Sequence, residues 1–487
     1  MTESEQSDTK DNIAEPSWVT EYTDQIINEF GDEDVFNIAT GISLSGPVHV
    51  GHLREFMTGA VVCNSLQNKG YKTELTAFAD DMDPLKHKYD FLPDEYKNYI
   101  GVPLYLIPSH LDENISYADF YLNELIDSLA ELKIYPKIIK SSDIYNSGRY
   151  NNYLNFVMKN KDEVLSTLGD ISGSEKRDVW PFKFVCPECH SSTTTNVLHF
   201  DETNGDTDIY CKKCEDQYKT NIFDNGGKLM WRFDWPVRWK SFNIHAEPVA
   251  QDHASKGGSY DSSSVILRKF FHGRAPIPLK YSWVKSREKT DLHTKTGVTS
   301  VKQLVDLYPP SIIWSMYALS NPSKPIYFDL KESLQDEVGE YIKQKPLLES
   351  ITPLGVELSP VFNEIDFNTI VSFIKTGRPL KNISDQDYNK LKKWIDLTDI
   401  NEEVTLSKDE KDLMKILSIR FNDIDTWSTG QIKRKFEEIS KEYKISIKDI
   451  SQLLYKYLFS ETSGPNIPAY FADLPKEEVI SKLTIKE

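Results

Sequence analysis

Residues 36–52, Phe36-Asn-Ile-Ala-Thr-Gly-Ile-Ser-Leu-Ser-Gly-Pro-Val-His-Val-Gly-His52, decide the fold together with the residues that follow them. Residues 35–39 are mostly apolar and form a short run, which is typical of a central parallel strand. Residues 40–46 are mostly small, so the backbone there can approach a ligand closely. The stretch therefore predicts a strand whose carboxyl end leads into a ligand-binding loop.

A helix is predicted after Pro47, because proline fixes φ at a helix start. Apolar residues then recur at helical spacing: Leu53, Phe56, Met57, Ala60 and Val61. Lys69 and Gly70 supply the stop, and residues 71–79 form a second strand. A helix N-terminus carries partial positive charge and unpaired N–H groups, which suit a phosphate. We expect His49 and His52 in the first turn of this helix.

The run Ser45-Gly-Pro-Val-His-Val-Gly-His52 resembles the His-Ile-Gly-His signature of class I aminoacyl-tRNA synthetases. In that family both imidazoles contact the phosphates of ATP. The match depends on context, since His-x-Gly-His alone is a weak motif. Here it follows a strand and a glycine-containing loop and precedes an amphipathic helix.

Composition limits the possibilities. The chain has 487 residues, of which 39% are hydrophobic, so roughly three or four domains are expected. No apolar run approaches the ~20 residues that cross a bilayer, so we expect no membrane. The net charge of −18 argues against a protein that coats nucleic acid, but it permits a large RNA held by a local basic patch.

An acidic segment follows the second strand, with Asp80, Asp81 and Asp83 before Pro84. These acids can meet a cationic substrate or a metal, or they can form a solvated turn. The segment resembles the Asp-Asp-x-Asp-Pro segment of class I lysyl-tRNA synthetases. A helix over 116–132, a strand over 137–140 and a helix over 143–168 come next. This alternation predicts an α/β fold with a Rossmann-type parallel sheet.

Four of the five cysteines form two pairs, Cys186-x2-Cys189 and Cys211-x2-Cys214, and residues 190–210 between them number 21. Thiolates in this spacing predict a zinc ribbon with tetrahedral S4 coordination and no open catalytic position. The zinc is expected to be structural, and His190 and His199 to be ordinary loop residues rather than replacement ligands. Paired thiols around a metal indicate a reducing cytoplasm.

The α/β pattern resumes at residues 228–239, so the zinc ribbon is an insertion in a split fold. Asp234, Arg238 and three tryptophans form a polar and aromatic cluster that can hold an amine by charge and cation–π contact, or that packs between domains. Asp-Trp-Pro-x-Arg-Trp, then Asp252-His-Ala, then Gly257-Gly-Ser-Tyr-Asp261 carry the strongest resemblance in the chain. In this order they resemble class I lysyl-tRNA synthetase, the form found mainly in archaea and some bacteria.

That resemblance extends from about Trp18 to the end of the chain. It implies ATP with Mg²⁺, lysine and tRNA(Lys) as ligands. It implies that lysine is bound by Gly41, Ser43, Asp234, Trp235, His253 and Tyr260. It implies that ATP is bound by Ser45, Gly46, His49, Gly51, His52, Asp252, Gly257 and Gly258. His49 and His52 are then the catalytic residues of the helix.

The family also carries a Lys-Met-Ser-Ser-Ser-Lys-Gly loop, whose lysines stabilise the pentacovalent phosphorus. This chain has Lys289-Thr-Asp-Leu-His-Thr-Lys-Thr-Gly297 in its place, with Asp291 at the first lysine position and Thr296 at the last. The loop keeps its place and length but changes its chemistry. We expect Lys295 to supply the missing charge at the ATP phosphates.

The predicted organisation has six parts. They are a disordered tail over 1–15, a catalytic domain split into 16–170 and 229–285, the zinc ribbon over 171–228, the altered loop and stem-contact region over 286–345, and a helical anticodon-binding domain over 346–487. The densest basic region, from Gln431 to Lys448, is interleaved with Phe436 and Tyr443. It suits a single-stranded anticodon loop, or it is an ordinary solvated helix face.

The reading that joins these features is a class I lysine–tRNA ligase, located in the cytoplasm, whose oligomeric state the sequence leaves open. One alternative is a class I synthetase for another amino acid such as glutamate, although a glutamate pocket should present arginine where this one offers Asp234 and aromatics. A second is a tRNA-binding paralogue that has lost activation, because the loop is altered. A zinc-ribbon nucleic-acid module fits less well, since it leaves the ATP-like loop without a purpose.

Overall fold

The computed structural model describes residues 14–173, 179–224, 226–286, 299–330, 333–398, 406–459 and 466–484. It divides into two compact units: Met1–Asp306 with Pro310–Glu357, and Leu307–Pro309 with Leu358–Glu487. The whole altered loop, including Lys295, and most of the predicted tail lie outside the described residues.

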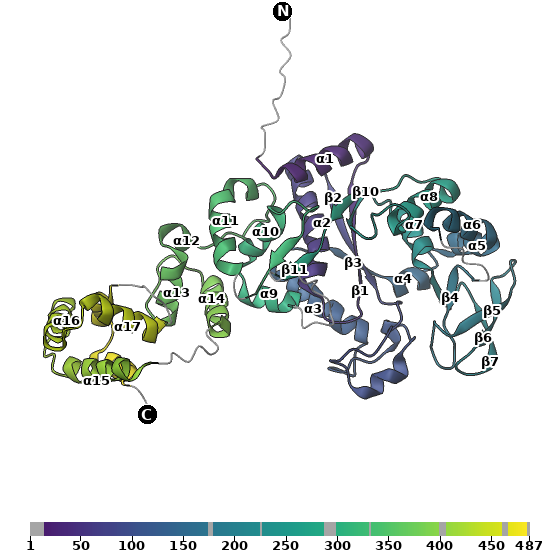
Figure 1. The fold of residues 1–487 in the computed structure, drawn as a ribbon. Coiled ribbons are helices and arrows are strands. Elements are labelled where there is room, and N and C mark those ends of the chain that lie inside the picture. The colour runs from purple at the N-terminus through teal and green to yellow at the C-terminus, as the bar shows by residue number, and fades with distance from the viewer. Residues whose placement is uncertain are drawn as a thin grey trace, which may run out of the picture. The chain divides into compact units, whose positions relative to one another are not determined.

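A five-stranded parallel sheet forms the centre of the first unit, in the order β10-β9-β1-β2-β3 (Figure 1). Its strands are β1 Phe36–Ser43, β2 Thr73–Asp80, β3 Lys137–Lys140, β9 Ala246–Ala250 and β10 Ile277–Tyr281. The prediction of a Rossmann-type sheet is confirmed. The chain adds β2 and β3 on one side of β1, then returns to add β9 and β10 on the other. Ligands of open α/β sheets bind at such a switch point, beyond the carboxyl ends of the strands.

Strand β1 is longer than predicted. Thr40 to Ser43 stay in the strand, because they pair in register with Ala77 to Asp80 of β2. Helix α2, Val50–Asn68, starts one residue after His49, which is its N-cap rather than part of its first turn. The helix ends at Lys69, and Gly70 follows with φ +89°, as the stop signal predicts.

Helix α2 packs against β1, β2 and β9, and helices α1 and α10 pack against α2.

The predicted helix over 116–132 is confirmed as α3. The predicted helix over 143–168 is instead three helices, because Gly148 takes φ +72° between the first two. The helices around the sheet are α1 Ser17–Phe30, α3 Tyr117–Glu131, α4 Ser141–Asn146, α5 Asn151–Lys159, α6 Lys161–Ser172, α7 Trp231–Ser241, α8 Ser259–Phe271, α9 Val301–Leu307, α10 Pro310–Ala318 and α11 Ser333–Leu348, with 3-10 turns η1 Asp94–Tyr99 and η2 Leu104–Leu106.

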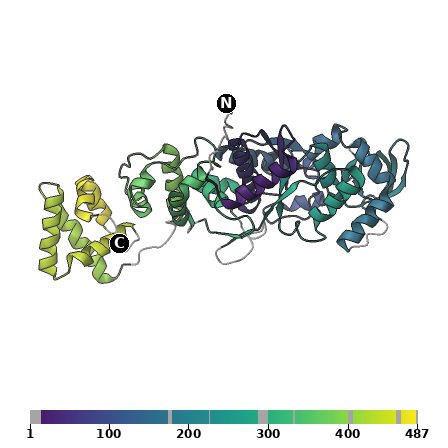
Figure 2. The ribbon, with the colours of Figure 1, turned by 90° about the horizontal axis from the view of Figure 1, so that it is seen from above.

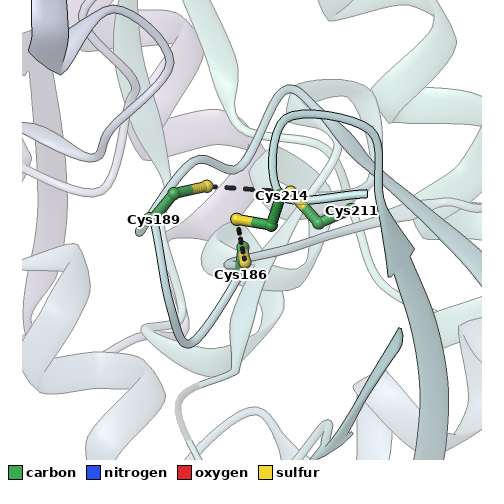
Figure 3. A group of neighbouring side chains, drawn as sticks. All are labelled: Cys186, Cys189, Cys211 and Cys214. Carbon is green, nitrogen blue, oxygen red and sulfur yellow. Dashed lines mark hydrogen bonds between the residues drawn. The ribbon is translucent and has the colours of Figure 1, made fainter. Parts of the chain in front are cut away.

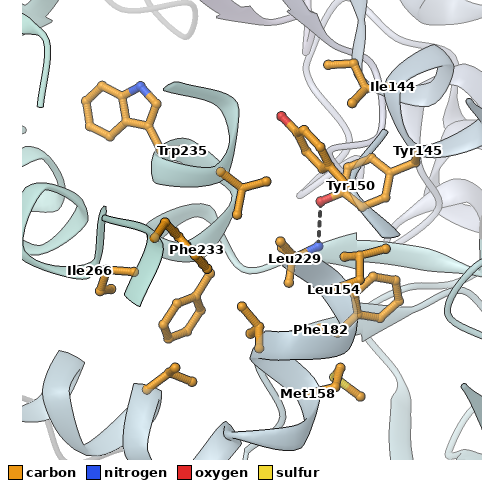
Figure 4. Packing of buried hydrophobic residues seen from close by; sticks show 14 of the residues in the cluster. Ile144, Tyr145, Tyr150, Leu154, Met158, Phe182, Leu229, Phe233, Trp235 and Ile266 are labelled. Atoms are coloured by element: carbon orange, nitrogen blue, oxygen red, sulfur yellow. Dashed lines mark hydrogen bonds between the residues drawn. The ribbon is translucent and has the colours of Figure 1, made fainter. Parts of the chain in front are cut away.

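The cysteine-containing insertion forms two small antiparallel sheets. Strands β4 Phe182–Phe184 and β8 Gly227–Leu229 pair at its base, and β5 Thr195–Phe200, β6 Asp206–Cys211 and β7 Asp216–Asn221 form the outer sheet. One hydrophobic core runs from the insertion through Phe182 and Leu229 to Phe233 and Trp235 of α7 (Figure 4). The insertion therefore shares one hydrophobic core with the parallel sheet and its helices. Two further strands, β11 Val284–Ser286 and β12 Ile326–Phe328, pair in parallel.

The second unit is helical, as predicted. Its helices are α12 Val361–Glu364, α13 Phe367–Lys375, α14 Asp385–Thr398, α15 Lys408–Asn422, α16 Thr429–Tyr443, α17 Ile447–Phe459, α18 Ile467–Ala472 and α19 Lys476–Leu483. The helices from α15 onward share a core around Met414, Phe421 and Phe436, and Figure 2 shows them grouped in yellow-green and yellow. Within the described residues, no helix is both long enough and apolar enough to cross a membrane.

Candidate active site

A cavity of about 810 Å³ opens at the carboxyl ends of β1 and β9, at the switch point of the sheet. Eight residues predicted from the sequence line it: Gly41, Ser43, His49, Gly51, His52, Trp235, Asp252 and His253. The rest of its wall is mainly charged and aromatic and includes Glu55, Asp80, Asp83, Lys86, Trp231, Arg238, Glu247, Tyr281 and Trp283. The sheet topology thus brings together segments that are about two hundred residues apart in the chain.

His49 and His52 stack at the entrance to helix α2, with ring centroids 3.7 Å apart. They also form its capping box: His49 Nδ1 accepts from the Gly51 N–H at 3.1 Å, and His52 Nδ1 accepts from the His49 N–H at 3.5 Å. Because both Nδ1 atoms accept, both rings carry their hydrogen on Nε2. Each imidazole therefore carries one N–H donor, on Nε2, at the N-terminus of the helix.

Burial, together with the nearby His49, lowers the pKa of His52 to about 3. His52 is therefore neutral at physiological pH. A neutral His52 can donate a hydrogen bond to a phosphate oxygen without changing its protonation during a reaction.

Glu55 lies one turn after His52 on α2 and was missed in the sequence. Its Oε1 accepts from the Gly41 N–H at 2.6 Å, and its Oε2 accepts from the Tyr281 hydroxyl at 2.9 Å. Burial raises the pKa of Glu55 to about 8, against the lowering effect of the Gly41 hydrogen bond. An acidic residue three positions after His52, on a helix that faces the ligand loop, was the signal available in the sequence.

Asp234 and Arg238 form a buried ion pair on α7, with Nη2 and Oδ2 2.9 Å apart. The Tyr145 hydroxyl donates to the other oxygen of Asp234 at 2.7 Å, and Arg238 also lies 3.5 Å from Asp80. Asp234 is fully buried and absent from the cavity wall, whereas Arg238 lines it. The carboxylates of Asp234 and Asp80 thus hold the guanidinium in place.

Asp80 and Asp83, called here the acid pair, line the cavity beside β2. Lys228 of β8 reaches both: its Nζ contacts Asp80 Oδ1 and lies 2.8 Å from Asp83 Oδ1. Burial alone would lower the pKa of Lys228, but the charges of Asp80 and Asp83 raise it above its usual value. Lys228 therefore offsets part of the negative charge of the acid pair, and Arg238 contacts Asp80 as well.

Tryptophans of α7 cover one side of the cavity. Trp231 and Trp235 stack with centroids 4.7 Å apart. Trp235 Nε1 donates to Glu247 at 3.0 Å, and Trp239 Nε1 donates to the same oxygen. Glu247 is only 2% exposed, so this acid serves mainly to orient the indoles. The stacked rings give the cavity an apolar face opposite its carboxylates.

Comparison with known proteins assigns this arrangement to a family. A family model described as tRNA synthetases class I (K) matches residues 16–352, more than half of the chain. The chain belongs to this family. The sheet, the cavity and the histidine pair all lie within the matched residues.

Relatives match the synthetase over most of its length. The lysine–tRNA ligase of Archaeoglobus fulgidus is 29% identical over 477 residues, which cover 92% of this chain and 95% of the relative. The lysine–tRNA ligase of Methanococcus maripaludis is 27% identical over 537 residues, covering 96% and 100%. Lysine–tRNA ligase 1 of Methanosarcina acetivorans is 33% identical over 326 residues, covering 66% and 60%.

Some predicted site residues of the synthetase lie away from the cavity wall. Gly257 takes φ +73° in the turn that leads to Gly258, the N-cap of α8. The Tyr260 hydroxyl donates to the Pro276 carbonyl at 2.6 Å. Ser45 accepts the Tyr117 hydroxyl on its carbonyl at 2.9 Å. Gly46, like these four and Asp234, is absent from the cavity lining.

The four cysteines of the synthetase meet in one cluster (Figure 3). All four Sγ atoms lie within 4.8 Å of one another, and the Cys186–Cys214 and Cys189–Cys211 sulfurs are 3.9 and 3.7 Å apart. Four thiolates at metal–sulfur distances of about 2.3 Å have sulfurs about 3.8 Å apart in a tetrahedron. The donor set therefore fits a tetrahedral metal ion.

Proposed function

We propose that this synthetase joins lysine to tRNA(Lys) through a lysyl-adenylate. The observation that carries the proposal is a cavity lined by carboxylates, in which Glu55 and Glu247 are both held by neutral hydrogen-bond donors. Glu55 accepts from a backbone N–H and a tyrosine hydroxyl, whereas Glu247 is buried and accepts from two indoles, so Glu55 is the better acceptor for a ligand. The relatives named as lysine–tRNA ligases support the same choice of amino acid.

We assign the ammonium of the substrate to Glu55 rather than to Asp234. Asp234 is buried and paired with Arg238, and the acid pair is engaged by Lys228. The stacked indoles of Trp231 and Trp235 suit the aliphatic stem of the substrate. A glutamate substrate would need a free guanidinium, whereas Arg238 is engaged by two carboxylates.

The reaction follows from the positions of these groups. The lysine carboxylate attacks the α-phosphorus of ATP, and pyrophosphate leaves. His49 and His52 donate from Nε2 to phosphate oxygens at the N-terminus of α2, where the helix field also favours negative charge. The adenylate then passes the lysyl group to the 2′-hydroxyl of the terminal adenosine of tRNA. Mg²⁺ would accompany the phosphates and neutralise part of their charge.

Four further assignments belong to this proposal. Zn²⁺ held by Cys186, Cys189, Cys211 and Cys214 is structural, because four thiolates leave no open position. Residues 346–487 bind the anticodon stem-loop, for which the exposed basic side chains of α16 are suited. The ligase is cytoplasmic, where reduced thiols persist. Lys295 supplies charge at the phosphates from the loop that the sequence analysis singled out.

The deciding experiment is ATP–pyrophosphate exchange with each amino acid in turn, with and without tRNA. We expect exchange with lysine and none above background with glutamate. Exchange with another amino acid would assign the cavity to a different substrate. An absence of exchange with lysine and cognate tRNA would favour the tRNA-binding paralogue that the altered loop suggests. Lys295→Ala, compared with Lys289→Ala, then tests whether Lys295 carries the charge.

A further inference from the structure

The cysteine-containing insertion is joined to the acid pair of the cavity by two connections. One runs through strand β8 to Lys228, and the other runs through the loop around Gly101. Both reach Asp83, and the first also reaches Asp80.

The strand connection begins at the first cysteine knuckle. Strand β4 leads directly into Cys186 and pairs with β8, so that Lys183 lies opposite Lys228. The Val185 N–H donates to the Gly226 carbonyl at 2.8 Å, which extends the pairing to the residue before Cys186. The position of the Lys228 backbone is therefore set next to the metal ligands. The Lys228 side chain is absent from the cavity lining, and its Nζ contacts both carboxylates of the acid pair.

The loop connection begins just after the same knuckle. The Ser192 N–H donates to the Gly101 carbonyl at 2.8 Å, the Gly101 N–H donates to the Leu85 carbonyl at 2.8 Å, and the Leu104 N–H donates to the Asp83 carbonyl at 3.0 Å. Gly101 has φ +89°, and a Cβ there would lie 2.4 Å from Thr193 Oγ1. A glycine is needed for this close approach. The backbone that presents Asp83 is thus pinned to the knuckle.

We propose that the insertion decides which carboxylate of the cavity accepts the ammonium of a ligand: by placing Lys228 between Asp80 and Asp83 it closes that pair to the ligand and leaves Glu55 as the acceptor. Lys228 is then a specificity-determining residue, and the metal cluster is the anchor that positions it. The inference rests on the proposed function, because it takes a lysine-like ammonium as the ligand.

The physical reason is competition between two anionic sites in one cavity. If Lys228 is removed, Asp83 loses its contact with a cation and Asp80 keeps only Arg238, so the acid pair can bind the substrate ammonium. Lysine held there would place its own carboxylate away from the α-phosphorus. Such nonproductive binding lowers kcat without raising KM.

Cadaverine, a diamine without a carboxylate, is the probe that separates ammonium binding from turnover. We expect Lys228→Met to bind cadaverine about tenfold more tightly or better by calorimetry, the gain of one charge-assisted contact. It should keep its metal content, and its kcat for lysine-dependent exchange should fall about tenfold with no rise in KM. Lys228→Arg is the matched control and should behave like the unmodified protein. Adding Asp83→Asn to Lys228→Met should remove most of the gain in cadaverine affinity.

Cys214→Ser tests the anchor. It should lose the metal and show the same two changes, tighter cadaverine and lower kcat without a higher KM. Gly101→Ala keeps every charge and every cysteine, so it should keep the metal. Because its Cβ would collide with Thr193, it should disturb the loop that presents Asp83 and tighten cadaverine binding as well. Gly101→Ala also carries the test if Lys228→Met fails to fold.

Two results would overturn the inference. One is an unchanged cadaverine affinity in folded Lys228→Met, or in Gly101→Ala if that variant takes its place. The other is a metal-free Cys214→Ser protein with unmodified cadaverine affinity, since the cluster would then not position Lys228. Cadaverine binding requires no turnover. A protein that shows no exchange with lysine would therefore refute the proposed function and leave this measurement interpretable.

Discussion

Glu55 makes lysine binding depend on pH. With a pKa of about 8, the side chain is largely protonated at pH 7, whereas a substrate ammonium favours the carboxylate. We expect lysine affinity to rise between pH 6 and 8 by up to about tenfold per unit. Calorimetry at pH 7 in two buffers of different ionisation enthalpy should report release of a proton with each lysine. Glu55→Gln should bind lysine about ten- to a hundredfold more weakly, with no pH dependence.

The same carboxyl group affects folding stability in the opposite sense. Its pKa is about 8 in the folded state and near 4.5 in the unfolded chain. The unfolded chain therefore holds fewer protons between these values, and this contribution to stability decreases as pH rises through that window. Asp252→Asn is the matched control for Glu55→Gln, because it removes an exposed carboxylate from the cavity rim. If lysine affinity does not change with pH and is unaffected by Glu55→Gln, Glu55 does not bind the substrate ammonium.

The histidine pair predicts a different pH profile. Because the pKa of His52 is about 3, the adenylation rate should show no titration of this residue between pH 5 and 8. His52→Ala should lower kcat by a factor of ~10²–10³ and weaken ATP binding less, as expected for a donor aimed at developing charge. His52→Gln, which keeps an N–H near the position of Nε2, should retain more activity than His52→Ala. Equal losses in ATP affinity and in kcat/KM would mark the histidine as a uniform binder.

At the scale of elements, Arg54 joins helix α2 to the backbone of Trp283 and of residues 321–324. The buried guanidinium donates to four carbonyls, those of Trp283, Asn321, Pro322 and Lys324, at 2.7 to 3.2 Å. Arg54→Met leaves these carbonyls without their donor and should reduce the free energy of unfolding by roughly 3 kcal/mol or more. Urea unfolding of the metal-loaded protein measures the loss.

The control for Arg54→Met is Arg54→Lys, which keeps the charge but has one compact donor group. It should recover part of the stability and not all of it. A loss below about 1 kcal/mol in Arg54→Met would show that water satisfies the carbonyls instead.

The elements were more accessible from the sequence than the contacts between them. Local signals gave the parallel strand, the helix after Pro47 and the cysteine pairs. They missed the extension of β1 through Ser43, because its pairing with β2 outweighs the loop-like composition of residues 40–43. They also missed the turn at Gly148, where the periodicity of the flanking helices seemed continuous.

Buried charge pairing lay beyond sequence reasoning for a physical reason. Lys228 and Asp80 are 148 residues apart, and Tyr145 and Asp234 are 89 apart. Spacing along the chain carries no information on such contacts. Asp234 therefore looked like a free acid beside aromatics, whereas the fold commits it to Arg238 and leaves Glu55 at the cavity.

At the scale of the whole molecule, a net charge of −18 requires any RNA contact to be local. Lys433, Arg434 and Lys441 are exposed on α16, while Phe436 is buried in the core of its bundle. Replacing Lys433 and Arg434 by Glu should weaken tRNA binding and reduce its salt dependence, because phosphate contacts release counterions. Filter binding of tRNA across salt concentrations measures both effects.

The matched variant reverses Lys408 and Lys411 of α15, which are also exposed. It changes the net charge by the same amount and should have a smaller effect on tRNA affinity. Equal losses from the two variants would indicate a general electrostatic response and not a binding face. Lysine and ATP binding, measured in the absence of tRNA, should be unchanged in both.

Strand β9, which pairs with β1 at the switch point of the sheet, is synthesised long after β1. Asn37 of β1 donates its N–H to His245 across 208 residues, immediately before Ala246 of β9 pairs with Ile38. At about 5–20 residues per second, a ribosome needs roughly 10–40 s to synthesise that interval. During this time one edge of β1, whose Phe36, Ile38 and Ala39 are buried in the folded protein, has no partner and can associate with other nascent chains. A polypeptide released before residue 245 should therefore aggregate, and prompt folding of this ligase in a cell should depend on factors that shield emerging chains.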